Sequence, residues 1–226
     1  MTEHARTALL LGSTGLVGGH VLRLLAKGGR WNRIVTLGRR AMEPVAQNHV
    51  HHVIDFDNMD LHAEHFACDD VFCCLGTTIK KAGSEEAFRH VDFDYPVEAA
   101  YLAHARGATQ YLLVSALGAN LKSRIFYNRL KGEVEDALRG AGFASLGIFR
   151  PSLLTGDREE HRRSEAIWSV GLTLAKPFLS GPFRKYRATP AEALARVMAD
   201  VAADSPKGAT VYEADAIMAR AQERRS

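Results

Sequence analysis

The chain has 226 residues, of which 46% are hydrophobic and 24% are charged, and its formal net charge is +3. This ordinary globular composition suits one domain with a full core. The mild positive charge contains no long basic run, so nucleic-acid binding is not indicated. No apolar stretch approaches the roughly 18 residues that a membrane span needs, so no membrane association is expected.

Six apolar runs alternate with helical patterns over the first 150 residues. The runs predict strands at 8–11, 34–37, 50–54, 71–75, 110–115 and 145–149. Helices are predicted at 16–27, 58–66, 84–90, 94–106 and 123–139, and residues 79–83 are expected to form a basic loop. This alternation predicts right-handed crossovers and an α/β fold, a doubly wound, Rossmann-type parallel sheet flanked by helices.

The pattern weakens after Pro151. Residues 152–189 include an apolar helical stretch at 166–175, and we expect them to form a substrate-side lid over the cleft. Within it, Trp168 and Phe178 either line a pocket or pack the lid itself. A helix at 190–203, a strand at 210–213 and a helix at 214–220 follow. Because no linker or repeat interrupts the chain, residues 1–226 are predicted to form a single domain.

The three cysteines Cys68, Cys73 and Cys74 form no even framework for disulfide bonds. Neighbouring strand residues point to opposite faces, so Cys73 and Cys74 are expected to be reduced core residues. The polar residues 1–7 contain no signal-peptide core. These features lead us to expect a cytosolic protein.

A glycine-rich turn follows the first apolar run, with Gly12, Gly15 and Gly18 spaced three residues apart. Gly12 permits the tight turn, Gly15 lets the backbone approach a pyrophosphate, and Gly18 lets the helix lie close to the strand. The helix start offers free N–H groups and the positive end of a dipole. The alternative is an ordinary strand-to-helix turn, but the context on both sides favours dinucleotide binding.

Arg39 and Arg40 follow the second predicted strand, where NAD-preferring folds place a carboxylate for the ribose 2′-hydroxyl. Two guanidinium groups suit a 2′-phosphate, so we predict NADP(H) in preference to NAD(H). A solvated basic loop is the alternative. The position of Asp55 and Phe56 after the third strand places them near the adenine.

The histidines His49, His51 and His52 suggest a metal site at first sight. His51 and His52 are neighbours on a predicted strand and therefore face opposite ways. No carboxylate or cysteine pattern completes a site around them, so no metal site is predicted.

Ser115, Tyr127 and Lys131 form a second constellation. Tyr127 and Lys131 are four residues apart and share a helix face, and Ser115 lies at the end of the preceding strand. A nearby ammonium lowers the pKa of a phenol, which can then exchange a proton with a substrate oxygen. Tyr and Lys at this spacing also occur by chance on helix surfaces.

These residues carry a resemblance. The Gly12–Gly18 turn with Ser115 and Tyr127-x-x-x-Lys131 resembles the short-chain dehydrogenase/reductase superfamily. Five further segments resemble its atypical, NADPH-binding branch, the Tat-interacting-protein-like oxidoreductases: 72–78 (FCCLGTT), 81–83 (KAG), 91–95 (VDFDY), 131–135 (KGEVE) and 149–151 (FRP). The resemblance covers about residues 7–155.

The resemblance implies further cofactor-binding residues. They are Ser13, Thr14, Leu16 and Val17 in the turn, Arg39 and Arg40 at the 2′-phosphate, Asp55 and Phe56 at the adenine, Leu75, Gly76, Thr77 and Lys131 at the ribose or nicotinamide, and Arg150, Pro151 and Ser152 beside the nicotinamide. Many superfamily members use an asparagine on the helix before the fifth strand. Asp92 takes the comparable place here, so their full proton relay is not predicted.

The sequence therefore predicts an NADP(H)-dependent oxidoreductase that reduces or oxidises a small carbonyl or alcohol substrate by hydride transfer. Tyr127 would be the acid or base, Lys131 would modulate it and Ser115 would orient the substrate. Two alternatives stay open: a non-catalytic NADP(H)-binding regulatory or redox-sensing protein, and a sugar-nucleotide epimerase-like enzyme. A homodimer and a protein partner also stay open.

Overall fold

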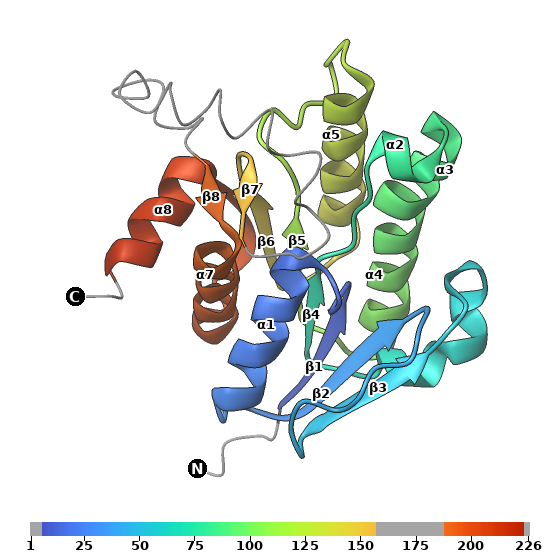
Figure 1. Ribbon diagram of the computed structural model, residues 1–226, viewed down its shortest axis with the longest axis vertical. Coiled ribbons are helices and arrows are strands. Elements are labelled where there is room, and N and C mark those ends of the chain that lie inside the picture. The colour runs from blue at the N-terminus through green and yellow to red at the C-terminus, as the bar shows by residue number, and fades with distance from the viewer. Residues whose placement is uncertain (1–5, 157–187, 224–226) are drawn as a thin grey trace.

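The computed structural model describes residues 6–156 and 188–223. Seven parallel strands form one sheet in the order β3-β2-β1-β4-β5-β6-β9 (Figure 1). The strands are β1 (Arg6–Leu11), β2 (Trp31–Gly38), β3 (His49–Val53), β4 (Asp70–Cys73), β5 (Gln110–Val114), β6 (Ser145–Arg150) and β9 (Gly208–Glu213). The predicted doubly wound parallel sheet is confirmed. The order reverses between β1 and β4, and ligands of such sheets bind at the carboxyl ends of the strands beside this point.

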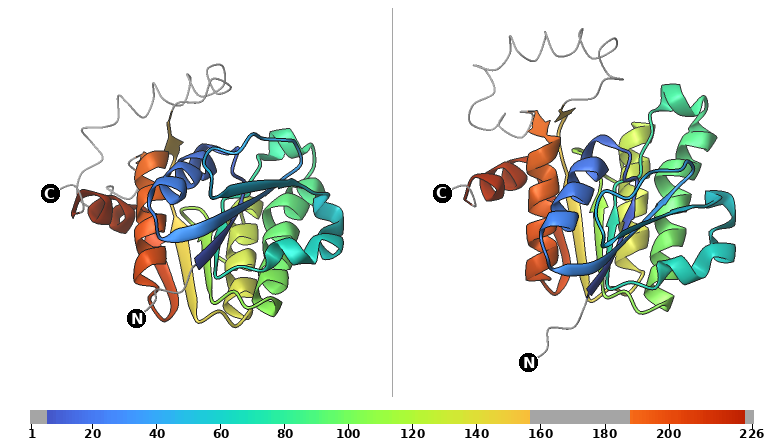
Figure 2. Two further views of the ribbon diagram at one scale, coloured as in Figure 1. Left: turned by 90° about the horizontal axis from the view of Figure 1, so that it is seen from below. Right: turned by 60° about the horizontal axis from the view of Figure 1, so that its bottom comes forward.

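Helices cover both faces of the sheet (Figure 2). The long ones are α1 (Leu16–Lys27), α4 (Tyr95–Ala105), α5 (Phe126–Arg139), α7 (Ala191–Asp204) and α8 (Ala214–Glu223). The short ones are the 3₁₀ segment η1 (Phe56–Phe66), α2 (Ile79–Ala82), α3 (Glu85–Arg89) and the π-helical turn η2 (His90–Asp94). None of the described helices is long and apolar enough to cross a membrane.

The strand alternation divides the core into two layers. Leu9 and Leu11 of β1 face the layer under η1, α4 and α5, whereas Ala8 and Leu10 face the layer under α1 and α7. Cys73 lies in the first layer and the neighbouring Cys74 packs against the second. Cys68, Cys73 and Cys74 are free thiols. Cys73 and Cys74 point to opposite faces of the sheet, which explains why these neighbouring thiols do not pair.

Several predicted boundaries change. Residues 79–83 are not a loop, because the Thr78 hydroxyl accepts a hydrogen bond from the Lys81 N–H and caps the short helix α2. The helix predicted from residue 123 begins at Phe126, since the Ser123 hydroxyl accepts from the Ile125 N–H and holds a turn there. The helix predicted at 58–66 is a kinked 3₁₀ segment.

The C-terminal part completes the sheet through β9, which pairs with β6, and α7 packs against α1. Two short strands, β7 (Leu154–Thr155) and β8 (Thr189–Pro190), pair in parallel beside it. The predicted helix at 166–175, with Trp168 and Phe178, lies outside the described residues. The lid at 152–189 and the single-domain boundary 1–226 stay predictions.

Candidate active site

The turn between β1 and α1 requires glycine at two positions. Gly12 has φ +79°, and a Cβ there would lie 2.5 Å from the Cys74 carbonyl oxygen. A Cβ on Gly18 would lie 2.1 Å from the Gly12 carbonyl oxygen. The Gly15 N–H closes the turn by donating to the Gly12 carbonyl oxygen at 2.9 Å. The tight turn and close helix approach predicted from the sequence are therefore present.

The N-terminus of α1 is arranged to receive an anion. Gly15 caps it without a side-chain acceptor, and the first turn contains no acidic residue. The peptide N–H groups at this end carry the positive end of the helix dipole. Ser13 and Val17 are buried, whereas the Thr14 side chain is exposed. These residues can hold a pyrophosphate through backbone N–H groups.

The two arginines after β2 are exposed, and a histidine supports the backbone that carries them. His51 Nε2 lies 2.8 Å from the Arg40 carbonyl oxygen, and His51 Nδ1 lies 2.8 Å from the Thr36 hydroxyl. The His52 ring points to the other face, as predicted, and stacks on His65. His51 is a supporting residue that the sequence alone did not suggest.

Asp55 and Phe56, which follow β3, have different surroundings. Asp55 is exposed and caps η1, accepting hydrogen bonds from the Asp57 N–H and from Asn58 Nδ2. The Phe56 ring is buried and packs against Tyr95 with 5.3 Å between ring centroids. Only the backbone of Phe56 can therefore reach an adenine from this arrangement, whereas the Asp55 side chain is at the surface.

Asp92 joins the loop after β4 to helix α5. One of its oxygens accepts a hydrogen bond from the Thr77 N–H at 2.8 Å, and the other lies 2.7 Å from Lys131 Nζ. Asp92 is 2% exposed and Lys131 is 4% exposed, so this ion pair is buried. Asp92 lies in the π-helical turn η2, a distortion often found at functional sites. A Cβ on Gly76, beside Thr77, would lie 3.6 Å from Asp92 Oδ1, so Gly76 is next to this carboxylate.

Tyr127 lies one helical turn before Lys131, and 36% of it is exposed. Burial raises the pKa of its phenol; the Lys131 ammonium opposes this rise and the Asp92 carboxylate adds to it. Lys131 therefore acts on the pKa of Tyr127 in the expected direction, but the effect of burial is larger. Burial by itself would lower the pKa of Lys131, but Asp92 and Tyr127 outweigh it and the pKa is raised. The ammonium is charged, but its charge is balanced by Asp92.

Ser115 is buried and faces a different partner. Its hydroxyl donates to Glu135 Oε1 at 2.5 Å, and among the described residues no hydrogen bond joins it to Tyr127. Glu135 also accepts from Arg150 Nε at 2.9 Å and from Nη2 at 2.5 Å. Arg150 Nη1 donates to Glu213 at 2.8 Å. The carboxylates of Glu135 and Glu213 thus hold the guanidinium of Arg150, a residue of the segment that the resemblance places beside the nicotinamide.

The residues that follow Arg150 tie the strand ends together. The Pro151 carbonyl oxygen accepts from the Leu117 N–H at 2.9 Å. The Ser152 hydroxyl lies 3.1 Å from the Thr189 hydroxyl, next to the pairing of β7 with β8. These contacts position the backbone at the ends of β5 and β6.

Two buried carboxylates were underestimated from the sequence. Asp92 was considered only as the residue in place of an asparagine, and Glu135 was not singled out as a site residue. The spacing Tyr127, Lys131, Glu135 repeats every four residues and places all three on one face of α5. That spacing was the available signal for Glu135.

The chain is similar in sequence to two groups of known proteins, HTATIP2 and FMP52. No protein-family model matches the chain. The chain is 38% identical to protein HTATIP2 of Rattus norvegicus over 164 residues, which cover 71% of this chain and 67% of that protein. It is 35% identical to the mitochondrial protein fmp52 of Emericella nidulans over 165 residues, covering 70% and 71% of the two chains.

The fold is also that of solved enzyme structures. MoeE5 in complex with UDP-glucose and NAD superposes with a TM-score of 0.69 at 13% identity, covering 96% of this chain and 81% of that chain. WbmH of Bordetella bronchiseptica, in complex with NAD⁺, superposes with a TM-score of 0.69 at 15% identity, covering 97% and 80%. At these identities the likeness shows a common Rossmann-type fold.

The expectation of a cytosolic protein is contradicted by the relatives. The matching FMP52 proteins of several fungi are named mitochondrial, among them FMP52-2 of Scheffersomyces stipitis at 34% identity. The free cysteines cannot decide the compartment, because burial on opposite faces of the sheet already keeps Cys73 from Cys74.

Proposed function

Because the chain belongs to the atypical short-chain dehydrogenase/reductases of the HTATIP2 and FMP52 type, we propose that it is an NADP(H)-dependent oxidoreductase acting on a small carbonyl or alcohol. The observation that carries the proposal is the buried Lys131–Asp92 ion pair, one turn from Tyr127 and hydrogen-bonded to the loop after β4. A phenol, an ammonium and a strand-end loop meet there at the edge of the sheet where Rossmann-type folds bind ligands.

The cradle between β1 and α1 fits a dinucleotide. Side chains at Gly12 and Gly18 would clash with backbone, and the uncapped start of α1 offers N–H groups to a pyrophosphate. MoeE5 and WbmH, solved with NAD and NAD⁺, support a nicotinamide cofactor. Asp55 and the Phe56 backbone would contact the adenine. Leu75, Gly76, Thr77 and Lys131 would contact the ribose and nicotinamide, with residues 150–152 beside them.

Arg39 and Arg40 favour NADP(H). Both side chains are exposed beyond the end of β2, where a carboxylate would select the 2′-hydroxyl of NAD(H). Arg39 also helps to lower the pKa of Asp57, after the larger effects of hydrogen bonds from Tyr95 and His90. A 2′-phosphate beyond the end of β2 would accept forked hydrogen bonds from the guanidinium groups.

Tyr127 suits the role of the acid in a reduction. A phenol that keeps its proton at neutral pH can donate it to a carbonyl oxygen as that oxygen gains negative charge. When bound, NADPH supplies the hydride that forms the new C–H bond at the carbonyl carbon. Proton and hydride together convert the carbonyl to an alcohol, and exposure of Tyr127 lets solvent restore its proton.

Ser115 takes a narrower role than the sequence predicts. A serine hydroxyl has one proton to donate, and Ser115 gives it to Glu135. Its oxygen can still accept a hydrogen bond from an alcohol. While the bond to Glu135 persists, Ser115 can orient the alcohol product but cannot donate to a carbonyl oxygen.

The decisive experiment is NADPH oxidation against a panel of small aldehydes and ketones with the wild type and Tyr127→Phe. We expect turnover to fall by about 100-fold or more, the usual effect of losing a positioned acid, with NADPH affinity nearly unchanged. Tyr101→Phe is a matched control, because Tyr101 is exposed on α4. Equal turnover in Tyr127→Phe and wild type would exclude Tyr127 as the acid.

One observation favours a second candidate, a non-catalytic NADP(H)-binding regulatory protein. Ser115, Tyr127 and Lys131 are not joined by hydrogen bonds, because Glu135 and Asp92 engage two of them. NADPH binding without turnover of any carbonyl in the panel would support this candidate.

A further inference from the structure

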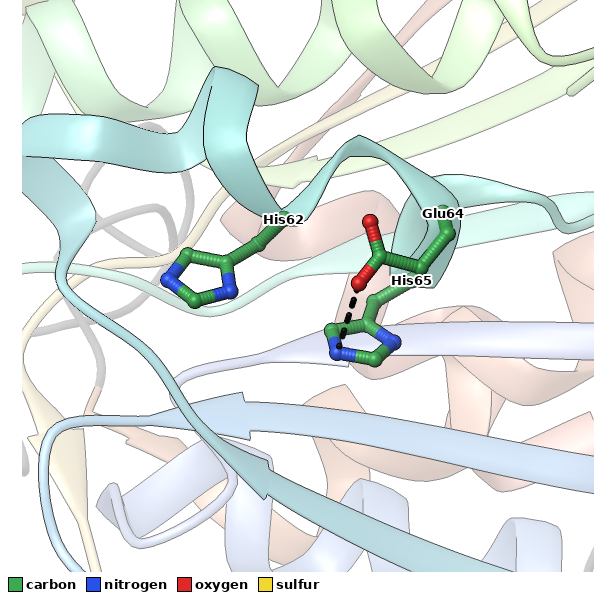
Figure 3. Close-up of side chains that lie close together, drawn as sticks. All are labelled: His62, Glu64 and His65. Atoms are coloured by element: carbon green, nitrogen blue, oxygen red, sulfur yellow. Dashed lines mark ion pairs between the residues drawn. The ribbon is translucent and has the colours of Figure 1, made fainter.

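Three potential metal ligands lie together on η1, away from the glycine turn. His62, Glu64 and His65 each offer a ligand atom, and these atoms lie within 4.8 Å of one another (Figure 3). They are distinct from His49, His51 and His52, whose sequence pattern did not predict a metal site. From this cluster we propose that the protein binds a divalent first-row cation of the zinc class.

The kinked backbone of η1 brings the two histidines together. The rings of His62 and His65 are nearly parallel, with 13° between their planes and 6.2 Å between their centroids. His62 itself has non-helical backbone angles, which kink the segment at the cluster. Figure 3 shows the Glu64 carboxylate folding back towards both rings.

The spacing of the donor atoms suits a metal better than a direct hydrogen bond. His65 Nε2 lies 3.5 Å from Glu64 Oε1, whereas hydrogen bonds between nitrogen and oxygen are about 2.7–3.2 Å long. Ligands of a tetrahedral zinc, each about 2.1 Å from the metal, are roughly 3.4 Å apart. The three ligand atoms lie within 4.8 Å of one another, so His62 would have to move by about 1 Å to reach the spacing of zinc ligands. The partial exposure of these side chains permits that movement.

The donor set and its charge also fit. Two imidazoles and one carboxylate are typical ligands of zinc and its neighbours. The carboxylate also brings negative charge to a site for a divalent cation. The Glu64 side chain is 64% exposed and that of His65 is 22% exposed, so a cation can enter from solvent.

His52 on the edge strand β3 supports the site. Its ring stacks on His65 with 3.8 Å between centroids and 11° between planes. Because the two rings are parallel, their nitrogen lone pairs do not converge on one point. His52 therefore orients the His65 ring and does not bind the same metal ion. Its Nε2 atom is buried without a hydrogen-bond partner in the described part of the chain.

The test is titration of the full chain, freed of metal, with Co²⁺ and Zn²⁺ separately. We expect one Co²⁺ per chain in the micromolar range with visible absorption bands, and displacement of Co²⁺ by Zn²⁺. The double variant His62→Gln/His65→Gln should bind at least about tenfold more weakly, whereas His20→Gln on α1, across the sheet, should bind like wild type.

The melting temperature and the affinity of a His52 variant test the proposed site further. Saturating Zn²⁺ should raise the melting temperature of the wild type but not of the double variant, because binding stabilises only the folded state that presents the site. His52→Phe should keep the affinity within a few-fold, because a phenyl ring can still stack on His65. Equal affinity in the double variant and wild type, or no Co²⁺ bands in the wild type, would overturn the proposal.

Discussion

The glycine turn between β1 and α1 and the charged cluster beneath α5 lie at the same edge of the sheet, but different forces hold them. The turn depends on backbone packing, since a Cβ at Gly12 or Gly18 would overlap a carbonyl oxygen. The cluster depends on buried ion pairs, Lys131 with Asp92 and Arg150 with Glu135. An added atom should therefore disrupt the turn, whereas a nearby change of charge should affect it little. The cluster should instead be disrupted mainly by a change of charge.

Removing Asp92 should have the largest effect. Asp92→Ala leaves the buried Lys131 ammonium without its partner, and an uncompensated buried charge costs about 3–5 kcal/mol of the free energy of unfolding. Urea denaturation measures this loss. The double variant Asp92→Ala/Lys131→Met should regain much of the stability, because it removes the unpaired charge. A loss below about 1 kcal/mol in the single variant would show that the pair contributes little.

An added methyl group in the glycine turn should have the next largest effect. Gly18→Ala places a Cβ 2.1 Å from the Gly12 carbonyl oxygen, so we expect a loss of about 1–3 kcal/mol and much weaker NADPH binding. Gly19→Ala is the matched control, because its nearest neighbour would be the Ser13 carbonyl oxygen at 3.5 Å. Helix propensity should make Gly19→Ala more stable by roughly 0.5–1 kcal/mol. Calorimetry and cofactor titration of both variants compare them; equal behaviour would contradict the packing role of Gly18.

Arg39→Gln should change cofactor choice without changing stability. Loss of a charge-assisted hydrogen bond to a 2′-phosphate should weaken NADPH binding by about tenfold or more and leave NADH binding unchanged. The free energy of unfolding should stay within about 0.5 kcal/mol, because Arg39 is exposed. Arg30→Gln, at the opposite end of β2, controls for the change in net charge. Fluorescence titration with both cofactors makes the comparison, and a parallel loss for NADPH and NADH would refute the assignment.

The smallest expected effect concerns His90, which contacts Asp57 in η1. Hydrogen bonds to Asp94 and Asp57 raise its pKa above the usual 6.5, so protonated His90 stabilises the folded state. This stabilisation is complete below pH 6.5 and is lost as pH rises through the folded-state pKa. His90→Gln should therefore reduce the fall in stability above pH 6.5. Denaturation of both proteins across that range tests it, and identical pH dependence would argue against the contacts.

The residues of the glycine turn and the strand runs could be predicted because their signals are local. The spacing of Gly12, Gly15 and Gly18 constrains a few consecutive residues, and an apolar run reports burial on both faces of a strand. The C-terminal strand β9 was also predicted, although its place beside β6 was not. Residues 79–83 were misjudged, because one hydroxyl cap from Thr78 outweighed their loop-like composition.

The partners of the charged residues depend on the tertiary structure. The sequence by itself determined a glycine turn, a parallel α/β fold, and a helix that places Tyr127 near Lys131. Only folding decided that Lys131 pairs with Asp92, 39 residues earlier, and that Ser115 donates to Glu135, 20 residues later. Helix and strand periodicity describe one element at a time, whereas these contacts depend on how η2, β5 and α5 pack together. The same packing raises the pKa of Tyr127, which the Tyr–Lys spacing alone would lower.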